Sequence, residues 1–323
     1  MKKVSIIGAG NVGATAAMNI ARMGICDEVV LLDIKEGVAE GKAMDIMQTL
    51  SIFGVPTNVT GVTSDYSTTK DSDIYVITSG VPRKPGMTRE ELVGVNSKVV
   101  TSVMDGITKY CYEGEKTPKF VIVSNPMDTM CMCVLKYLQN KYPSSRETFY
   151  DQIIGMGGLL DTNRFKYFIK KGLEKHFKTN IININDIYGY VVGGHGDTTM
   201  IPVYEHAHYL SYSIKDLLSF DELNEIIENT MKGGATLTKL LGTSAWEAPA
   251  AGIAITAKAI LNNEHKVIPC SSYGHPYKCF IGQMCTLGEE GIESIDWHCE
   301  TIERVQKKLL ESAEAIRKVN ESL

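Results

Sequence analysis

Residues 4–13 read VSIIGAGNVG, an apolar run that passes directly into a G-x-G-x-x-G pattern. A second apolar run, residues 29–32, ends in Asp33, twenty residues after Gly13. A strand, a glycine-rich turn, a helix, a second strand and an acidic residue in this order form a dinucleotide-binding fingerprint. We therefore expect the chain to begin with a β-α-β unit of a parallel sheet.

Each glycine of the pattern has a physical role. Gly8 lets the chain turn sharply away from the strand, and Gly10 lets the backbone approach a pyrophosphate without a Cβ in between. Gly13 allows the helix that follows to pack closely on the sheet. The N–H groups and the dipole at the start of that helix favour phosphate, so Asn11 and Val12 are expected cofactor contacts beside the glycines.

Asp33 predicts which dinucleotide is bound. Its carboxylate can accept hydrogen bonds from both hydroxyls of an adenine ribose. The same charge repels a 2′-phosphate. The sequence therefore indicates NAD rather than NADP.

Length and composition are those of an ordinary globular protein of about two domains. The 323 residues include 44% hydrophobic and 22% charged side chains, and the formal net charge is −5. A negative balance provides no basic surface for nucleic acid or an anionic membrane. No apolar stretch reaches the roughly 18 residues of a membrane span, and the run at residues 4–7 is too short for a signal peptide. We expect a cytoplasmic protein.

The eight cysteines do not form the pattern of a disulfide scaffold. They lie mostly in apolar or helical surroundings, where free buried thiols are common. On a helix, side chains two residues apart diverge, which argues against a metal pair at Cys131 and Cys133 or at His206 and His208. No metal site is expected.

Strands and helices alternate over the first half of the chain. Continuous apolar runs predict strands at residues 4–7, 29–32, 59–62, 74–78 and 120–123. Helical spacing predicts helices at residues 11–23, 37–51, 90–112 and 127–141. Fully apolar strands separated by helices are typical of a doubly wound parallel sheet, the Rossmann type of α/β fold. We assign residues 1–143 to this NAD-binding domain.

Residues 144–323 are expected to form a second, α+β domain that holds the substrate. A polar, proline-bearing segment at residues 142–147 is the expected crossing between the two halves. Helices are predicted at residues 159–177, 222–241, 248–261 and 298–319. Strands are predicted at residues 181–184, 187–192, 267–269 and 279–284.

A histidine enclosed by glycines follows an apolar run, because residues 193–197 read GGHGD. Little packs around such a residue, so the His195 ring can face a ligand; a loop histidine in a glycine turn is the alternative. Upstream, Asp161 and Arg164 lie three residues apart on a predicted helix and leave the same face. An intrahelical salt bridge is the other explanation for that pair.

Two further segments belong to the carboxyl edge of the sheet, where open α/β sheets bind ligands. Residues 80–89, GVPRKPGMTR, follow the fourth strand and carry three cations, two prolines and two glycines. By themselves they would also suit a solvated basic turn. Residues 124–126, SNP, follow the fifth strand at the same edge.

These motifs together resemble those of the NAD-dependent lactate/malate dehydrogenases. In chain order they are GAGNVG, Asp33, GVPRKPGMTR, SNP, LDTNRF, GGHGD and LLGTSAW, and the resemblance extends from Gly8 to the C-terminal helix. Within the family, the chain is most similar to the malate dehydrogenases that are lactate-dehydrogenase-like in sequence. The resemblance implies hydride transfer between NAD and a small 2-hydroxy acid, with malate and oxaloacetate as the pair.

The resemblance assigns a role to the polar residues of these motifs. His195 is implied as the proton donor and acceptor for the substrate C2 oxygen, a task that suits a group titrating near neutrality. Asp161 is implied to accept the other ring N–H, and Arg164 to clamp the C1 carboxylate as a bidentate fork. Arg89 would polarise the carbonyl as charge develops, while Asn125 would hold the substrate oxygen and orient the nicotinamide.

Arg83 occupies the position that would distinguish between substrates, facing the substituent on C3. A second carboxylate there, as in oxaloacetate, requires a cation, whereas pyruvate carries only a methyl group. Asn96 and Val123 are implied as further cofactor contacts. A lactate dehydrogenase that tolerates Arg83 is one alternative. A catalytically silent NAD-binding module is another, although it would have no use for a complete set of proton-relay residues.

The resemblance also implies a homodimer or a homotetramer, and the tetramer is favoured because lactate-dehydrogenase-like relatives usually form one. The chain departs from the commoner family pattern at residues 112–118, 142–151 and 271–278, which we expect to be longer loops. Trp246 and Glu247 are bulkier than the residues that many relatives carry near the substrate end.

Overall fold

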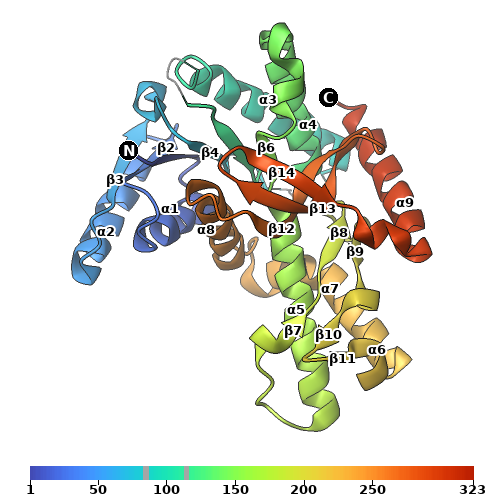
Figure 1. Cartoon of the computed structure of the whole chain (residues 1–323). Coiled ribbons are helices and arrows are strands. Elements are labelled where there is room, and N and C mark those ends of the chain that lie inside the picture. The colour runs from blue at the N-terminus through green and yellow to red at the C-terminus, as the bar shows by residue number, and fades with distance from the viewer. Residues whose placement is uncertain (83–86, 113–115) are drawn as a thin grey trace.

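The computed structural model describes residues 1–82, 87–112 and 116–323, and of Arg89, Arg146 and Thr148 it describes the main chain only. Within these residues, eleven strands form one sheet that runs through the molecule (Figure 1). The strand order is β3-β2-β1-β4-β5-β6-β12-β13-β8-β9, and β14 pairs with β13. A parallel half built from the N-terminal part of the chain is thus joined to an antiparallel half built from the C-terminal part.

The parallel half has strands whose carboxyl ends reach one edge together. The strands are β1 (Lys3–Ile7), β2 (Glu28–Asp33), β3 (Asn58–Thr63), β4 (Ile74–Ile77), β5 (Lys119–Ile122) and β6 (Ile153–Gly155). Ile7 of β1 lies opposite Leu32 of β2 and Ile77 of β4, so these three strands end side by side. All residues of β1 and β4 are buried, as expected of parallel strands that helices cover on both faces.

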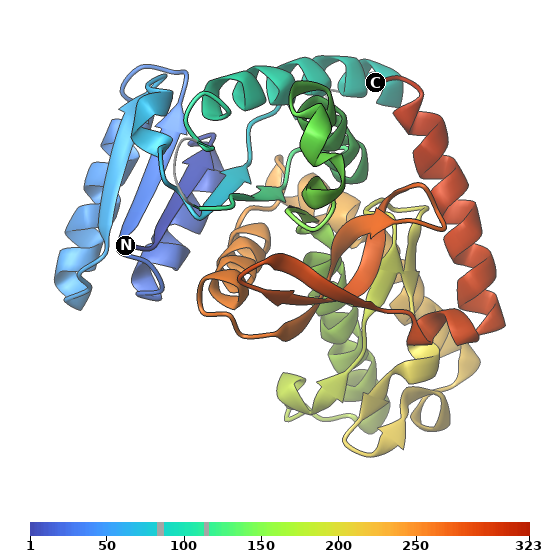
Figure 2. The same ribbon diagram turned by 45° about the horizontal axis from the view of Figure 1, so that its top comes forward.

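Two layers of helices cover the parallel half. The layers consist of α1 (Asn11–Arg22), α2 (Val38–Phe53) and α8 (Glu247–Leu261) on one face, and α3 (Arg89–Ile107) and α4 (Met127–Lys141) on the other (Figure 2). Val4 and Ile6 of β1 pack into the hydrophobic core beneath α1, α2 and α8, whereas Ile7 packs into the core beneath α3 and α4. Alternate residues of a strand therefore fill opposite layers, as the two-residue period of a strand requires.

The sheet changes from parallel to antiparallel at β6. This strand pairs parallel with β5, while its Gly155 lies opposite Ser271 in an antiparallel pairing. The antiparallel strands are β8 (Val191–Gly193), β9 (Met200–Pro202), β12 (Lys266–Gly274), β13 (Cys279–Gly288) and β14 (Gly291–Asp296). Helix α9 (Glu303–Asn320) packs across β8, β9 and β13 and also contacts α4.

Helix α5 (Gly157–Phe177) leads from the sheet into a lower lobe, which Figure 1 shows in green and yellow. There α5 packs against α7 (Phe220–Leu241) around a core of its own. The lobe is completed by β7 (Ile187–Tyr188), β10 (His208–Tyr209), β11 (Tyr212–Ser213) and α6 (Ile214–Leu217). The first three of these form a separate antiparallel sheet in the order β11-β10-β7.

The alternation predicted for the first half of the chain is confirmed. Each of the five strands and four helices expected there is present, with bounds that differ by one or two residues at most ends. The clearest difference is α3, which ends at Ile107 rather than at residue 112. A doubly wound parallel sheet followed by a C-terminal α/β part is therefore the fold of this protein.

Several expectations for the second half were wrong. The strand expected at residues 181–184 is not formed, and Ile184–Asp186 is a 3-10 helix. The strand expected at residues 187–192 is divided into β7 and β8. The expected loop at residues 271–278 begins as part of β12, and residues 142–151 contain a 3-10 helix rather than an open loop.

Apart from β14, which has six residues, the strands that the sequence did not predict are short. Strands of two or three residues, such as β6, β9, β10 and β11, offer no alternation from which a strand can be recognised. The helix expected from residue 298 begins at Glu303, because a 3-10 helix precedes it. The 3-10 helices are Tyr66–Thr69, Pro143–Phe149, Ile184–Asp186, Tyr204–His206 and His298–Thr301.

Candidate active site

The loops that follow β1, β4 and β5 are joined at the carboxyl edge of the sheet. Thr78 Oγ1 donates to the carbonyl oxygen of Gly8 at 2.9 Å, and Ser79 Oγ donates to that of Ile7 at 2.7 Å. Ser124, after β5, donates from Oγ to the carbonyl oxygen of Ser79. These bonds hold three loops in one place, at the edge where open α/β sheets bind ligands.

The glycine loop has a closed inner side and an open outer side. Gly8 has φ +115°, a conformation that favours glycine, and a Cβ at Gly13 would overlap the carbonyl oxygen of Gly8. A Cβ at Gly10, in contrast, would meet nothing within 4 Å. Gly10 caps α1 without a side-chain hydrogen bond, so the first N–H groups of the helix face the open side. This arrangement fits a pyrophosphate.

Asp33 is oriented by two main-chain donors. Its Oδ2 accepts from the Ala9 N–H at 2.7 Å, and its Oδ1 accepts from the Lys35 N–H at 2.9 Å. The carboxylate is partly exposed beside the glycine loop, and each oxygen retains a second lone pair. Asp33 therefore has the capacity to accept two ribose hydroxyls.

Asn96 connects the loop after β4 to the loop after β5. Its side chain is buried, accepts from the Val81 N–H at 2.8 Å and donates to the carbonyl oxygens of Val81 and Asn125 at 3.2 and 2.6 Å. Both sides of the amide are thus engaged by the protein itself. Val123 is partly buried at the end of β5, and the Asn125 side chain is exposed at the same edge.

The carboxylate of Asp161 contacts both His195 and Arg164, the two residues that the sequence analysis grouped with it. Its Oδ2 lies 2.7 Å from Nδ1 of His195, and its Oδ1 accepts from Nη1 of Arg164 at 3.0 Å. Asp161 and Arg164 come from α5, whereas His195 lies just beyond β8. The intrahelical salt bridge considered above does exist, and the same carboxylate also orients the imidazole.

The electrostatic surroundings favour the protonated imidazole. Burial of His195 by itself would lower its pKa, but the charge of Asp161, the hydrogen bond to it and the charge of Asp128 together raise the pKa above the ordinary value. Arg164 opposes this rise. Because Asp161 takes up Nδ1, Nε2 is the nitrogen left to exchange a proton with a ligand.

Two glycines that the sequence analysis did not use provide space for these side chains. A Cβ at Gly157 would overlap the His195 ring, and a Cβ at Gly233 would overlap the side chain of Arg164. Gly157 lies at the start of α5, and Gly233 lies in α7. Glycine within a helix costs up to about 1 kcal/mol relative to alanine, and this cost is the signal that could have identified both positions.

The basic loop is described only in part. Arg83, the residue expected to distinguish substrates, lies outside the described residues. Arg89 is the first residue of α3, and its main chain is placed by a capping box, in which Thr88 and Glu91 each bind the other's main chain. Trp246 donates to Glu247 at 2.9 Å at the start of α8.

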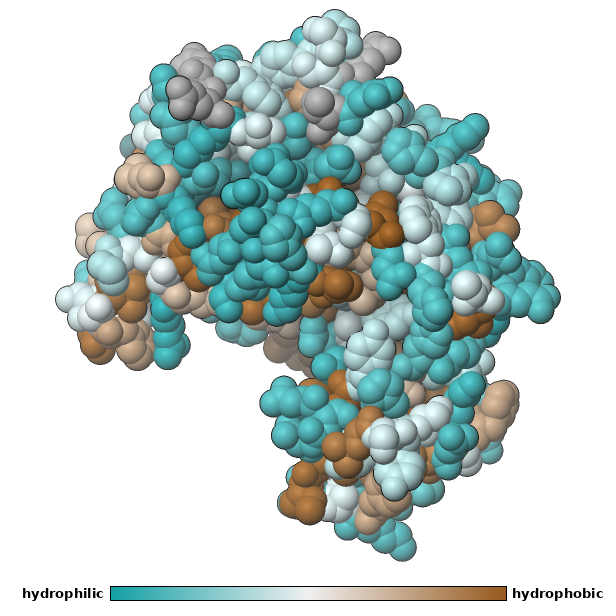
Figure 3. All heavy atoms as spheres, in the orientation of Figure 1, coloured by the Kyte–Doolittle hydropathy of each residue, from teal (hydrophilic) through white to brown (hydrophobic). Residues whose placement is uncertain are grey.

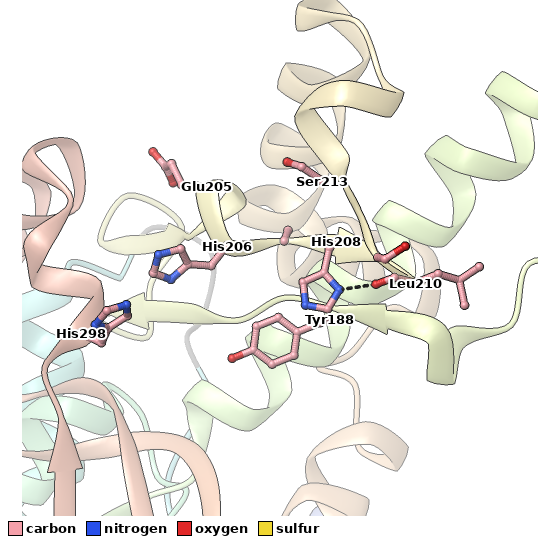
Figure 4. Close-up of a pocket in the computed structure, with 9 residues that line it drawn as sticks. Tyr188, Glu205, His206, His208, Leu210, Ser213 and His298 are labelled. Atoms are coloured by element: carbon pink, nitrogen blue, oxygen red, sulfur yellow. Dashed lines mark hydrogen bonds between the residues drawn. The ribbon is translucent and has the colours of Figure 1, made fainter.

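The two residue pairs that the sequence analysis considered as metal ligands lie in different parts of the fold. Cys131 and Cys133 are buried in α4, where burial raises the pKa of both thiols. His206 and His208 do not share a helix, as had been expected, but lie in a 3-10 helix and in β10. They line an open cavity of about 470 Å³ together with His298 (Figure 4).

In the part of the chain that the structure describes, no three His, Cys, Asp or Glu side chains are grouped to hold a metal ion. The helices of the same residues include none long and apolar enough to cross a membrane.

Comparison with known families identifies the class of protein. The model of the lactate/malate dehydrogenase NAD-binding domain matches residues 2–146, and that of the lactate/malate dehydrogenase alpha/beta C-terminal domain matches residues 159–322. The chain therefore belongs to the lactate/malate dehydrogenase family.

Individual relatives cover the chain from end to end. It is 49% identical to a malate dehydrogenase of Parabacteroides distasonis over 100% of this chain and 98% of the relative. It is 47% identical to one of Flavobacterium johnsoniae, over 99% of this chain and 98% of that one. Among solved structures, a malate dehydrogenase from Salinibacter ruber superposes with a TM-score of 0.83 at 32% identity, covering 99% of this chain and 97% of that one.

A lactate dehydrogenase has an equally similar fold. The enzyme from Cryptosporidium parvum, solved with lactic acid and nicotinamide adenine dinucleotide, superposes with a TM-score of 0.84 at 29% identity. The alignment covers 99% of this chain and 97% of that one. The overall fold therefore does not distinguish the two activities, and residues of the site must do so.

Replacing Asp161 by asparagine tests the electrostatic account of His195. An amide can still accept the ring N–H, but it removes the charge that opposes the effect of burial. We expect the pKa of His195 in Asp161→Asn to fall by at least about one unit, equivalent to about 1.4 kcal/mol. An NMR titration of the imidazole measures this pKa directly. Asp197→Asn, a nearby exposed carboxylate, is the control, and an unchanged titration in Asp161→Asn would contradict the account.

Proposed function

We propose that this protein is an NAD-dependent malate dehydrogenase, which interconverts malate and oxaloacetate in the tricarboxylic acid cycle. The observation that carries the proposal is the buried Asp161 carboxylate, which binds both His195 and Arg164. One group of residues thereby combines a proton donor with a cation for a carboxylate. The relatives named malate dehydrogenase, which match the chain over its whole length, support the same conclusion.

His195 exchanges the proton at the substrate C2 oxygen. In the direction of oxaloacetate reduction, Nε2 donates its proton to this oxygen while Nδ1 remains bonded to Asp161. In malate oxidation, neutral Nε2 accepts the hydroxyl proton, and the Asp161 charge stabilises the imidazolium that forms. The bound nicotinamide supplies or takes up the hydride.

The arginines and Asn125 orient the substrate. Arg164 binds the C1 carboxylate as a planar fork, which places C2 within reach of His195. Arg89 polarises the C2 carbonyl, and Asn125 holds the same oxygen from the loop after β5. Arg83 binds the second carboxylate of the four-carbon acid. These are roles for a transition state that carries more negative charge on oxygen than the ground state does.

Replacing Arg83 tests the choice of substrate. A pair of unit charges near 4 Å is worth roughly 4 kcal/mol at an effective dielectric constant of 20, and about half of this would discriminate by on the order of thirtyfold. We expect Arg83→Gln to lower kcat/KM for oxaloacetate by about this factor and to leave pyruvate reduction unchanged or improved. The loss of NADH absorbance with each acid measures both activities.

Lys84→Ala is the matched control, because the lysine is a neighbouring cation of the same loop. An unchanged ratio of oxaloacetate to pyruvate activity in Arg83→Gln would remove the basis of the malate assignment and favour a lactate dehydrogenase. Wild-type protein that binds NADH but oxidises it with neither acid would instead be a silent NAD-binding module.

We further propose NAD rather than NADP as the cofactor, with Gly8, Gly10, Asn11, Val12 and Gly13 around the pyrophosphate. Asp33 would bind the adenine ribose, and Asn96, Val123 and Asn125 would lie near the nicotinamide. The match to an NAD-binding domain supports the class of cofactor, and the two free lone pairs of Asp33 support NAD in particular. The side-chain amide of Asn96 is already bound to the main chain of Val81 and Asn125. Asn96 would therefore contribute to cofactor binding indirectly, by holding the two loops in place.

Replacing Asp33 tests cofactor choice. Asp33→Ser removes the charge that repels a 2′-phosphate, so the ratio of kcat/KM with NADPH to that with NADH should rise by about tenfold, or about 1.4 kcal/mol. Asp45→Ser, an exposed carboxylate of α2, should leave this ratio unchanged. If the wild-type protein already uses NADPH as well as NADH, Asp33 does not have the proposed role.

A homotetramer is the proposed assembly. Large apolar side chains are exposed on two separate surfaces. The α2 surface comprises Met44, Ile52 and Phe53, and the lower-lobe surface comprises Ile181, Tyr188, Leu210 and Tyr212. Figure 3 shows apolar side chains gathered on the lower lobe and near α2. In Figure 4, Tyr188 stacks on His208 beside Leu210, with ring centroids 4.9 Å apart. Two self-complementary surfaces on one chain are what a tetramer requires.

Light scattering tests this assembly. The wild-type protein should have four times the mass of one chain, and either Ile52→Asp or Leu210→Asp should halve that mass by placing a charge in one of the two interfaces. Leu310→Asp is the control, since Leu310 is an exposed apolar residue of α9 outside both surfaces. A wild-type mass equal to one chain would contradict the proposal.

We also propose that the chain divides near residues 143 and 144 and that the protein works in the cytoplasm. The two family models support a division into two domains, although their junction, residues 147–158, lies a few residues after the proposed boundary. The location in the cytoplasm is supported by the eight cysteines, which are all free and buried, as is usual where thiols are kept reduced.

A further inference from the structure

Asp128 is a second buried carboxylate next to His195, besides Asp161. It lies in the first turn of α4, three residues after Asn125, and is 7% exposed. Its Oδ2 accepts the main-chain N–H of His195 at 2.7 Å, and its Oδ1 accepts from Ser271 Oγ at 2.6 Å. A single side chain therefore connects α4, the loop after β8 and the middle of β12.

The loop that carries His195 depends on such outside contacts. Gly193 has φ +86°, and Gly194 and Gly196 add further conformational freedom, which must be restricted if the ring is to keep one position. Two consecutive N–H groups are bound from different helices. Ser312 of α9 accepts that of Gly194 at 2.9 Å, as does the carbonyl oxygen of Thr199 at 3.1 Å, and Asp128 of α4 accepts that of His195. The contact of Asp128 is the one that fixes the residue bearing the imidazole.

The charge of Asp128 acts in the same direction as that of Asp161. Burial, with a smaller contribution from the charge of Asp161, holds the pKa of Asp128 above its ordinary value, although the bonds from Ser271 and the His195 N–H and the charge of His195 act against this rise. The first turn of α4 also favours a negative charge. On the side of His195, Asp128 adds to the effect of Asp161, which holds the pKa of the ring above its ordinary value although burial and Arg164 oppose it.

Besides His195 and Asp161, the titratable groups near Asp128 include the thiols of Cys131 and Cys279. Burial, followed by the charge of Asp128, raises the pKa of Cys131 in α4 and of Cys279 in β13. Both thiols therefore stay uncharged near neutral pH and add no charge beside Asp128. The protonated ring of His195 is the cation that balances it.

We propose that Asp128 is a positioning residue for the proton transfer, which holds the main chain of His195 and supplies the second negative charge that favours its protonated form. The proposal rests on the proposed role of His195 as the proton donor and acceptor. It adds that the ring is oriented from two sides, by Asp161 through Nδ1 and by Asp128 through the main chain.

Two variants of one residue separate geometry from charge. In Asp128→Asn, the amide oxygen can accept the His195 N–H and the amide NH2 can donate to Ser271 Oγ, so the contacts are kept and the charge is lost. We expect the descending limb of oxaloacetate reduction against pH to move to lower pH, because His195 loses its proton earlier. In Asp128→Ala both contacts are lost, and kcat should fall by about a hundredfold.

A merely structural role would produce a different pattern. Under our proposal, the NADH dissociation constant and the KM for oxaloacetate stay within about twofold in both variants, because Arg164 and the glycine loop are untouched. Ser312→Ala, which removes the neighbouring contact without changing any charge, should lower the melting temperature but leave the pH profile in place. Asp73→Asn, at a carboxylate that accepts from the Lys3 N–H and pairs with Lys116 at the opposite edge of the sheet, removes a distant charge and should likewise leave the pH profile in place.

An NMR titration of the His195 ring separates this proposal from the proposed function, since it needs no substrate. A pKa of His195 that is lower in Asp128→Asn than in the wild type supports the proposal, even if neither oxaloacetate nor pyruvate is reduced. An unchanged pKa, or an Asp128→Ala variant with kcat within twofold of the wild type, overturns it. Full turnover in His195→Asn would contradict the proposed function instead, whatever the titration shows.

Discussion

The structure of the site depends on one shared carboxylate. Asp161 is almost fully buried and binds Nδ1 of His195 with one oxygen and Nη1 of Arg164 with the other. A buried charge is tolerated only when it is paired and hydrogen-bonded, so the two partners and Asp161 require one another. The three-residue spacing on α5 places Arg164 beside Asp161, but His195 comes from a separate segment, the loop after β8. The position of β8 relative to α5 is therefore what assembles the site.

The balance of charge around His195 follows from this packing. Asp161 and Asp128 approach the residue from α5 and α4, and Arg164 is the fixed cation on the same side. A protonated imidazole completes two pairs of opposite charges in a region that water reaches poorly. The ring is then held between fixed charges, an arrangement that suits the proton transfer proposed for it.

At the carboxyl edge of the parallel sheet, the loops proposed to bind the cofactor are positioned by strand register and by hydrogen bonds between loops. Ile7, Leu32 and Ile77 lie in register, so the loops after β1, β2 and β4 start from the same level. Hydrogen bonds from Thr78 and Ser79 then join the loops after β1 and β4, and Asp33 at the end of β2 accepts from the Ala9 N–H. Asn96 joins the loop after β4 to the loop after β5. Further along the sheet, β6 joins the parallel strands to β12 through Gly155 and Ser271, and Ser271 also binds Asp128. The cofactor edge and the histidine loop are thus parts of one continuous sheet.

The sequence by itself determined the features that are encoded in contiguous residues. The glycine loop with Asp33, the alternation of strands and helices, and the motifs around Asn125, Asp161, Arg164 and His195 could all be recognised, because each has a local period or spacing. Only the tertiary structure decided which of them meet. The contact of Asp128 with His195 and the space that Gly157 and Gly233 leave for the His195 and Arg164 side chains join residues tens of positions apart. The short strand β6 likewise pairs through Gly155 with the distant Ser271. Such pairings leave no periodic trace in the chain, since they depend on how strands and helices pack rather than on what precedes or follows each residue.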